Sequence, residues 1–328
     1  MVKVAIVGAT GLVGSTFLKV LEEKKLPIDS YTLLASKNSK GKKVRFMNHD
    51  YIVEELTKDS FNNNRFNFAL FSAGGKVSEI YAPIAAKNNC IVIDNSSTFR
   101  MKEEVPLVVP EVNSEDILKN NGIIANPNCS TIQAVIPLKP LHDNYKIKRI
   151  IYSTYQAVSG AGIKGIDDLQ NEKNWKNPVK FPYPIYNNCL PHIDIFMENG
   201  YTKEEMKMIE ETKKILNDPT LQITATTVRV PVKNCHCESI NIEFEEEFNI
   251  DELKQILNRS KGLVILDDIN KNIYPLPSFV DGKDEVFVGR IRRDYSVKNG
   301  INLWVVADNI RKGAATNAVQ ILEKLLYK

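Results

Sequence analysis

Residues 126–133, Asn-Pro-Asn-Cys-Ser-Thr-Ile-Gln, place a cysteine where its thiol could act as a nucleophile. Cys129 follows a short strand pattern, Ile123–Ala125, and precedes an apolar helical run, Ile132–Leu138. A thiol at a helix N-terminus has a lowered pKa, because the helix dipole and the free backbone N–H groups stabilise the thiolate. A buried structural cysteine is the alternative. The position predicts a thiolate that forms a covalent intermediate.

Two side chains suited to acyl transfer lie further along the chain. Arg229 stands within an apolar strand pattern, Ile223–Val232, where an unpaired charge would be costly. Its planar guanidinium would bind a substrate carboxylate through two hydrogen bonds, and an internal Asp or Glu partner is the alternative. His236 is one of four histidines. A lone histidine is more often structural, but the neutral-range pKa of an imidazole suits proton transfer.

A charged pair lies on a strong helix pattern, Tyr201–Leu216, which opens with capping-box spacing at Thr202 and Glu205. Glu204 and Lys207 are three residues apart and therefore share one face of this helix. The pair is either part of a binding site or an exposed salt bridge on a solvated surface.

A glycine-rich loop near the start of the chain predicts a dinucleotide site. Gly8, Gly11 and Gly14 separate a buried strand pattern, Val2–Val7, from a helix pattern, Ser15–Glu23. Glycines in this context let the backbone approach a pyrophosphate, which the helix N-terminus attracts. The spacing is GxxGxxG and not the commoner GxGxxG, so a plain glycine turn is the alternative.

The next predicted strand, Tyr31–Ala35, favours NADP over NAD. NAD-preferring folds place Asp or Glu at the end of this strand, where it binds the ribose hydroxyls. Here the strand is followed by Ser36-Lys-Asn-Ser-Lys40, which offers hydroxyls and amines and lacks an acid. These groups suit a 2′-phosphate. Use of both cofactors stays open.

The elements that position these residues predict two domains, as 328 residues suggest. Strands alternate with helices up to residue 130, which predicts a Rossmann-type doubly wound α/β domain. Longer strands rich in β-branched residues follow, which predicts an α+β domain with a large, mostly antiparallel sheet. We expect residues 1–130 with a C-terminal helix, 308–328, to form the NADP-binding domain, and residues 131–307 the catalytic and dimerisation domain.

Composition excludes several other classes. The net charge of +3 is too small to indicate nucleic-acid binding, and neither a signal peptide nor an apolar run long enough to cross a membrane is present. We expect a cytoplasmic protein whose five cysteines are free thiols. Cys235-His-Cys237 lacks zinc-ligand spacing, and we expect no metal, even with Cys189 and His192 upstream.

Several long segments, in order along nearly the whole chain, resemble those of aspartate-semialdehyde dehydrogenases. A family arginine that meets the 2′-phosphate is replaced here by Asn38, which Lys37, Lys40, Ser36 or Ser39 would compensate. The segments that carry the resemblance are Gly8–Gly14, Asp94–Arg100, Asn126–Gln133, Ser153–Gly162, Arg229–Ser239, Phe287–Arg292 and Leu303–Asn309.

The resemblance implies a role for each matching residue. Cys129 would be the nucleophile, His236 the general acid/base, and Gln156 the amide that orients the substrate. Substrate or phosphate contacts would come from Arg100, Asn128, Gln156, Glu204, Lys207 and Arg229. Cofactor contacts would come from Gly8, Thr10, Gly11, Leu12, Val13, Gly14, Ser36, Asn38, Ser39, Ser72, Ser159, Gly160 and Asn309.

The implied reaction is the NADPH-dependent conversion of L-4-aspartyl phosphate to L-aspartate 4-semialdehyde and phosphate. It would proceed through a Cys129 thioester and serve lysine (diaminopimelate), methionine and threonine biosynthesis, in a homodimer. N-acetylglutamyl-phosphate reductase shares this thioester chemistry and is the nearest rival. A non-catalytic NADP-binding sensor is a rival from another class, but it would not need Cys129, Gln156, Arg229 and His236 together.

Overall fold

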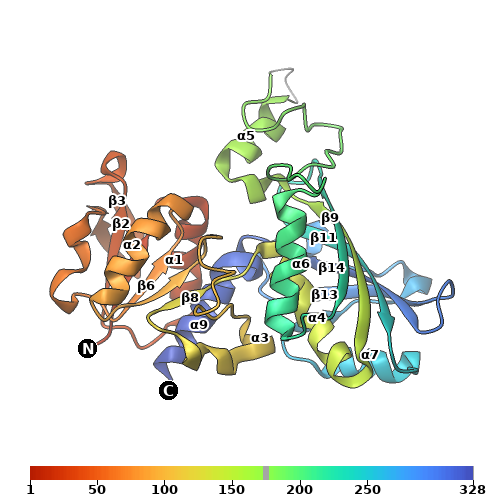
Figure 1. Ribbon diagram of the computed structural model, residues 1–328. Coiled ribbons are helices and arrows are strands. Elements are labelled where there is room, and N and C mark those ends of the chain that lie inside the picture. Colours follow the sequence, from red (N-terminus) through yellow and green to blue (C-terminus); the bar gives the residue numbers. More distant parts are fainter. Residues whose placement is uncertain (173–176, 328) are drawn as a thin grey trace. The chain divides into compact units, whose positions relative to one another are not determined.

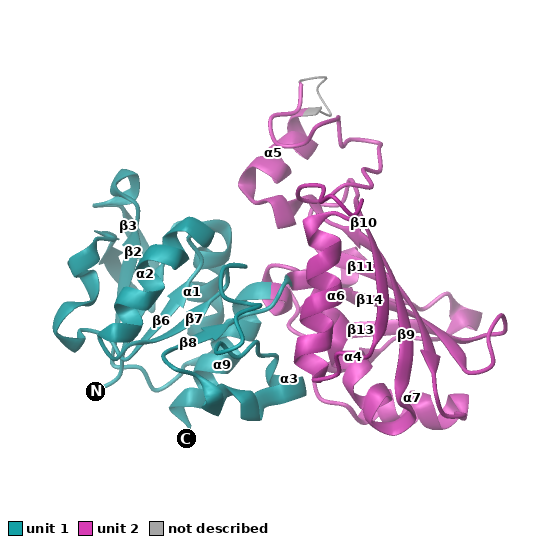
Figure 2. Cartoon of the chain, viewed as in Figure 1, with its two compact units in different colours: residues 1–128, 314–328 teal, residues 129–313 magenta. Residues whose placement is uncertain are grey.

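The computed structural model describes residues 1–172 and 177–327 (Figure 1). The chain divides into two compact units: residues 1–128 with 314–328 form unit 1, and residues 129–313 form unit 2 (Figure 2). Unit 1 is built on a parallel sheet flanked by helices, and unit 2 on a mixed sheet with helices on one face. The predicted fold class is confirmed.

The sheet of unit 1 has the strand order β5-β2-β1-β6-β7-β8, with neighbouring strands parallel. The strand order reverses between β1 and β6, and ligands of such folds bind at the carboxyl ends of the strands beside that point. The strands are β1 (Lys3–Val7), β2 (Ser30–Ala35), β5 (Glu54–Glu55), β6 (Phe68–Phe71), β7 (Ile91–Asp94) and β8 (Ile123–Ala125); β3 (Lys43–Phe46) and β4 (His49–Ile52) form a separate hairpin.

Alternating side chains bury both faces of this sheet. Val4 and Ile6 of β1 pack with α1 (Leu12–Lys24) and α9 (Asn317–Leu326), whereas Ala5 and Val7 pack toward α2 (Gly75–Lys87). Apolar residues on every position of a strand are typical of a parallel sheet covered on both sides. The short helix α3 (Pro110–Asn113) also belongs to this unit. The predicted final helix is in part a π-helical turn, Arg311–Thr316, that precedes α9.

The sheet of unit 2 has the strand order β10-β9-β11-β14-β13-β12. The inner pairs are antiparallel, but the edge pairs β10–β9 and β12–β13 are parallel. The predicted mostly antiparallel sheet therefore has parallel edges. Long segments with their own helices join the edge strands, as parallel pairing requires. The strands are β9 (Ile147–Gln156), β10 (Gln222–Arg229), β11 (His236–Phe244), β12 (Leu263–Ile265), β13 (Val286–Asp294) and β14 (Gly300–Ala307).

Helices α4 (Cys129–Tyr145), α6 (Lys203–Leu216) and α7 (Ile250–Arg259) cover one face of this sheet (Figure 1). In β11, Ile240 and Ile242 are buried under them, whereas Ser239, Asn241 and Glu243 are half-exposed on the other face. On the second face, Cys237, Phe287 and Val306 are buried with Val280, and the rest of that face is uncovered within the described chain. The shorter helices α5 (Ile163–Glu172) and α8 (Pro277–Val280) complete the unit.

None of the helices among the described residues has the length and apolar character needed to span a lipid bilayer.

The capping box predicted at the start of α6 is present. Thr202 Oγ1 accepts a hydrogen bond from Glu205 N, and Glu205 Oε2 accepts one from Thr202 N at 2.7 Å. Glu205 Oε1 also accepts from Thr227 N of β10 at 3.0 Å, so this carboxylate fastens the helix to the sheet. The orientation of α6, and with it of Glu204 and Lys207, depends on these bonds.

We predict that Thr202→Ala lowers the free energy of unfolding by about 1 kcal/mol, because the backbone N–H of Glu205 loses its cap. Denaturant titration of the purified variant measures this change. Thr202→Ser retains the hydroxyl and serves as the control. Equal stability of the alanine and serine variants would contradict the assigned capping role.

Candidate active site

Cys129 is the first residue of α4, directly after the loop that follows β8, as the sequence predicts. Its side chain is half-buried. A Cβ placed on Gly313 would lie 2.9 Å from Cys129 Cβ, so glycine is required for the close approach of that turn. Gly313 is not among the predicted site residues, because its only signal in the sequence is a glycine inside an apolar helical pattern.

Gln156, Arg229 and His236 gather at one edge of the unit 2 sheet. Gln156 ends β9 and pairs in register with Arg229, which ends the parallel strand β10. β11 runs antiparallel to β9 and begins at His236, so its first residue lies beside the end of β9. All three residues are buried. The sheet register therefore brings together side chains that are 80 residues apart in the sequence.

Arg229 is buried without an ion pair among the residues that the structure describes. Its Nη1 donates to the carbonyl oxygen of Ala157 at 2.6 Å. Burial lowers the pKa of the guanidinium, while the negative charges of Glu204 and Cys129 oppose this shift. The internal carboxylate partner considered as the alternative is absent within ion-pair distance in the described chain. The remaining donors of the guanidinium can therefore bind an anionic ligand.

His236 is held as a neutral hydrogen-bond donor. Its Nδ1 accepts a hydrogen bond from the backbone N–H of Ala157 at 3.0 Å, so the proton of the neutral ring is on Nε2. Burial, reinforced by the charge of Arg229, lowers the pKa of His236 to about 3. Nε2 is buried and has no hydrogen-bond partner among the described residues. The ring can therefore present a proton to a bound substrate.

Gly160 keeps the space between these two side chains open. A Cβ at this position would lie 3.0 Å from Arg229 Nη1 and 3.2 Å from His236 Nε2. The resemblance predicts Gly160 as a cofactor contact. In the structure it lies beside Arg229, a predicted substrate-binding residue, and His236, a predicted catalytic residue.

Ser159 and Asn309 hold the backbone that precedes His236. Asn309 Nδ2 donates to Ser159 Oγ at 3.0 Å, and Asn309 Oδ1 accepts from Cys235 N at 2.9 Å. Cys235 has φ of 72°, which is strained for a residue with a side chain. These bonds fix the strained residue and with it the direction of His236.

Glu204 is buried and its partner Lys207 is partly buried, so the interpretation as an exposed salt bridge is wrong. Glu204 is 5% exposed; its Oε1 accepts from Gln156 Nε2 at 3.2 Å and its Oε2 from Lys207 Nζ at 2.9 Å. Lys207 also contacts Asp194 Oδ2 at 2.8 Å. Burial disfavours the ammonium, but both carboxylates outweigh it and raise the pKa of Lys207. The pair joins α6 to the end of β9.

The glycine loop of unit 1 has the shape that a pyrophosphate site needs. Gly8 has φ of +85°, and a Cβ on Gly14 would lie 2.0 Å from the Gly8 carbonyl oxygen. α1 begins after Gly11 without a side-chain cap and without an acidic residue in its first turn. The first backbone N–H groups of α1, including those near Leu12 and Val13, therefore face no competing acceptor from a cap, which fits a bound phosphate.

Other predicted cofactor residues surround this loop. Thr10 Oγ1 lies 3.2 Å from Ser39 Oγ, which joins the loop to the turn after β2. A Cβ on Gly8 would contact the backbone of Ser72, which follows β6 at the switch point. Ser36 and Asn38 are exposed beside this turn. Lys40, by contrast, pairs with Glu55 at 3.3 Å, so its ammonium is engaged elsewhere.

Two predicted substrate residues lie in unit 1. Arg100 is buried; its Nε donates to the carbonyl oxygen of Asn126 at 2.9 Å and its Nη2 to that of Asn95 at 3.1 Å. Asn128 is also buried and directly precedes Cys129 in the chain. These bonds fix Arg100 against the same loop that leads to the cysteine.

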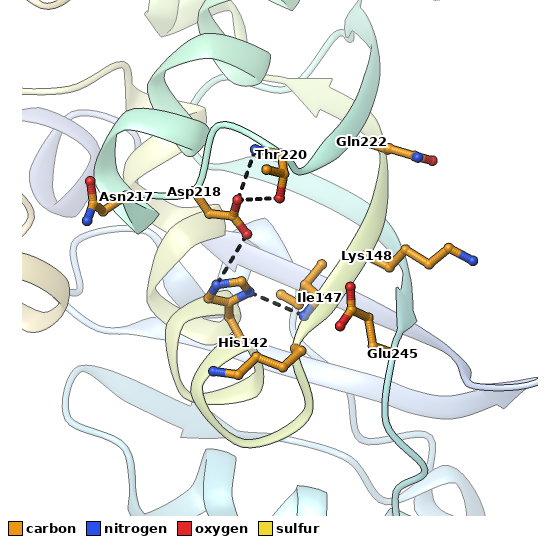
Figure 3. Close-up of a pocket in the computed structure, with 9 residues that line it drawn as sticks. His142, Ile147, Lys148, Asn217, Asp218, Thr220, Gln222 and Glu245 are labelled. Carbon is orange, nitrogen blue, oxygen red and sulfur yellow. Dashed lines mark hydrogen bonds and ion pairs between the residues drawn. The ribbon is translucent and has the colours of Figure 1, made fainter.

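A surface cavity of about 560 Å³ lies at the far end of unit 2 (Figure 3). His142 and Asp218 line it where α4 and α6 end, whereas Gln156 lies roughly 30 Å along β9 at about 3.3 Å per residue. Asp218 accepts two hydrogen bonds from Thr220, and His142 Nδ1 accepts from Ile147 N. Because these polar groups bind one another, the cavity is not the candidate active site.

One group of possible metal ligands occurs among the described residues. Side-chain atoms of Cys235, Asp281 and Asp308 lie within 4.8 Å of one another. Asp308 accepts hydrogen bonds from the backbone of Gly282 and Ile310, and Cys235 Sγ contacts the Pro277 carbonyl oxygen. These contacts give the group a role in fastening loops.

Comparison with known proteins identifies the family. Residues 3–120 match the semialdehyde dehydrogenase NAD-binding domain, and residues 138–312 match the semialdehyde dehydrogenase dimerisation domain. The chain therefore belongs to the semialdehyde dehydrogenase family, a family of oxidoreductases. The resemblance found in the sequence is confirmed.

The relatives carry a more specific name. The chain is 54% identical to the aspartate-semialdehyde dehydrogenase of Aquifex aeolicus, over 99% of this chain and 98% of the relative. It is 49% identical to that of Bacillus subtilis, over 98% and 96%.

Solved structures agree with these relatives. Aspartate semialdehyde dehydrogenase II of Vibrio cholerae, solved in complex with ASA, superimposes with a TM-score of 0.96 at 47% identity, over 100% of this chain and 99% of that one. The Candida albicans aspartate semialdehyde dehydrogenase, solved with NADP, gives 0.79 at 27% identity, over 99% and 98%.

We predict that stability depends on pH through His236. Between pH 6.5 and about 3, the unfolded chain binds a proton at this residue that the folded chain does not. The stabilisation is therefore complete above pH 6.5 and declines as the pH falls, by up to about 1.4 kcal/mol per pH unit. His236→Asn, whose amide oxygen can accept from Ala157 N, should lose less stability over this window.

Unfolding titrations at several pH values measure the effect, with the exposed His49→Asn as the control. Parallel pH profiles for the wild type and His236→Asn would show that His236 titrates normally.

Proposed function

We propose that this chain interconverts L-4-aspartyl phosphate and L-aspartate 4-semialdehyde through a thioester on Cys129, as an aspartate-semialdehyde dehydrogenase. The names of its full-length relatives support the substrate. The observation that carries the chemistry is the set of Gln156, Arg229 and His236 at one sheet edge in the unit that begins with Cys129. Arg229, buried without an internal carboxylate among the described residues, is suited to the carboxylate of an amino-acid substrate.

The other polar residues complete the substrate site in this proposal. Gln156 orients the reacting carbonyl group, and the negative charge of Glu204 suits the ammonium of the substrate. Lys207, whose positive charge is secured by Glu204 and Asp194, offers a cation to the phosphate. Arg100 and Asn128 are further proposed phosphate contacts.

The first step is attack of the Cys129 thiolate on the acyl carbon. The N-terminus of α4 and the charge of Arg229 stabilise the thiolate. A carbon–sulfur bond forms, the bond from carbon to the phosphate oxygen breaks, and phosphate leaves with the electron pair. The product is a thioester, and covalent catalysis thereby divides one difficult transfer into two easier ones.

His236 stabilises the oxyanion of the second step. As the thioester is reduced to the thiohemiacetal level, Nε2–H donates a hydrogen bond to the developing oxyanion. The oxyanion then reforms the carbonyl group as the carbon–sulfur bond breaks, which releases the aldehyde and regenerates the thiolate. Because Nδ1 is held by Ala157 N, the donor nitrogen keeps facing the substrate throughout.

NADP would be held by the loop from Gly8 to Gly14, by Thr10 and Ser72, and by the turn after β2. When bound, the cofactor supplies the hydride that reduces the thioester. The turn after β2 offers the hydroxyls of Ser36 and Ser39 and the amine of Lys37 to a 2′-phosphate. Ser159, Gly160 and Asn309 are further proposed cofactor contacts.

A homodimer is the proposed assembly. The match to a dimerisation domain covers the unit whose sheet has one uncovered face. Tyr155 is 40% exposed on that face and packs on Trp304 at 5.6 Å between ring centroids. A second copy would cover these rings, since exposed aromatic pairs are typical of interfaces.

The proposal is tested by phosphate-dependent reduction of NADP with L-aspartate semialdehyde, beside NAD and beside N-acetylglutamate semialdehyde. We expect rapid NADPH formation with the first substrate only, and slower turnover with NAD. Activity with N-acetylglutamate semialdehyde alone would agree with the thioester mechanism but contradict the proposed substrate. No activity with either would contradict the enzyme assignment.

We predict that Cys129→Ser loses turnover by about 1,000-fold or more while cofactor binding survives, because a hydroxyl is a poor nucleophile here. Steady-state rates and NADPH fluorescence titration measure the two properties. Cys189→Ser, at an exposed thiol, is the matched control. Turnover near the wild-type rate in Cys129→Ser would exclude the covalent mechanism.

We predict that Arg229→Lys raises the substrate KM by about 10- to 100-fold, because lysine cannot make the paired hydrogen bonds that a guanidinium makes to a carboxylate. The exposed Arg259→Lys provides the matched control. An unchanged KM would place Arg229 outside the substrate site.

A further inference from the structure

A buried polar chain runs from the centre of the unit 2 sheet to Gln156. Thr154 Oγ1 donates to Gln156 Oε1 at 3.0 Å, and Gln156 Nε2 donates to Glu204 Oε1 at 3.2 Å. Thr154 is fully buried and Gln156 is 1% exposed. The amide therefore has one partner on each side, both out of contact with water.

The direction of these hydrogen bonds follows from Glu204. A carboxylate only accepts hydrogen bonds, so the nitrogen of the Gln156 amide must face it and the oxygen must face Thr154. Lys207 Nζ binds the other oxygen of Glu204 at 2.9 Å and keeps that carboxylate ionised. The hydroxyl of Thr154 therefore donates its single proton in a hydrogen bond to Gln156 Oε1.

A second buried group lies directly opposite Thr154. Glu238 of β11 is the register partner of Thr154 of β9, and both are fully buried on the helix-covered face. Opposed side chains of this kind have Cβ atoms about 5 Å apart. Neither carboxyl oxygen of Glu238 has a hydrogen-bond partner among the described residues.

Among the described residues, no positive charge shifts the pKa of Glu238. The nearby titratable groups are Tyr152, whose hydroxyl bonds Thr212 of α6, and Cys237 on the same strand. Burial raises the pKa of Glu238 well above its usual range. Since no hydrogen bond joins Glu238 to Thr154 in the described chain, the Thr154 hydroxyl is left to Gln156.

We propose that Thr154 is a positioning residue that fixes the Gln156 amide for the reaction. The inference rests on the proposed role of Gln156 in orienting the substrate. It adds one residue to the site, which does not touch the reacting atoms. Its contribution is to keep the amide from turning while the acyl carbon is attacked.

The test compares kcat and KM for Thr154→Val and Thr154→Ser, with Gln156→Ala as the reference. Valine has the shape of threonine but no hydroxyl, so we expect kcat to fall about tenfold or more while KM changes less than about twofold. Serine restores the hydroxyl and should recover most of kcat. Equal losses in both variants, or normal kcat in Thr154→Val, would overturn the inference.

Unfolding measurements confirm that each Thr154 variant is folded.

The reference variant separates this inference from the proposed function. A loss of kcat in Gln156→Ala together with a normal Thr154→Val would refute the positioning role alone. An unchanged kcat in Gln156→Ala would refute the role of Gln156 itself, and the positioning role with it.

Discussion

The candidate site depends on one buried charge. Arg229 is 5% exposed, holds one backbone carbonyl, and has no ion pair in the described parts of the chain. An isolated buried cation is unfavourable, so the fold tolerates it at a free-energy cost that a bound carboxylate would offset. The same charge helps to keep His236 neutral and attracts a thiolate at Cys129. Substrate binding, proton transfer and nucleophile activation are therefore coupled through a single guanidinium.

The sheet register makes this coupling possible. Parallel pairing of β9 with β10 sets Gln156 beside Arg229, and antiparallel pairing of β9 with β11 adds His236. A shift of one residue in either pairing would turn a catalytic side chain to the uncovered face. Ala157 fixes this arrangement, because its carbonyl oxygen accepts a hydrogen bond from Arg229 and its N–H donates one to His236. Rigid strand ends thus hold groups that loops would position less accurately.

The sequence predicts which residues take part in the candidate site, but it does not predict which side chains contact them in the folded chain. The glycine loop and the cysteine at a helix start are local patterns, and both were predicted because the signal lies within a few residues. Thr154 and Gly313 carry no such signal, since their importance comes from a hydrogen bond across the fold and from steric contact. The parallel sheet edges were missed for the same reason. Glu204–Lys207 was ambiguous because burial of a helix face depends on what packs against it.

The central claim is that substrate is carried on Cys129 as a thioester. Mass spectrometry of the intact protein and its peptides, after incubation with L-aspartate semialdehyde and NADP in the absence of phosphate, tests it most directly. The account predicts about one aspartyl adduct per chain on the Cys129 peptide, formed together with a burst of NADPH and lost when phosphate is added. A burst of NADPH without an adduct, or an adduct confined to another cysteine, would contradict it.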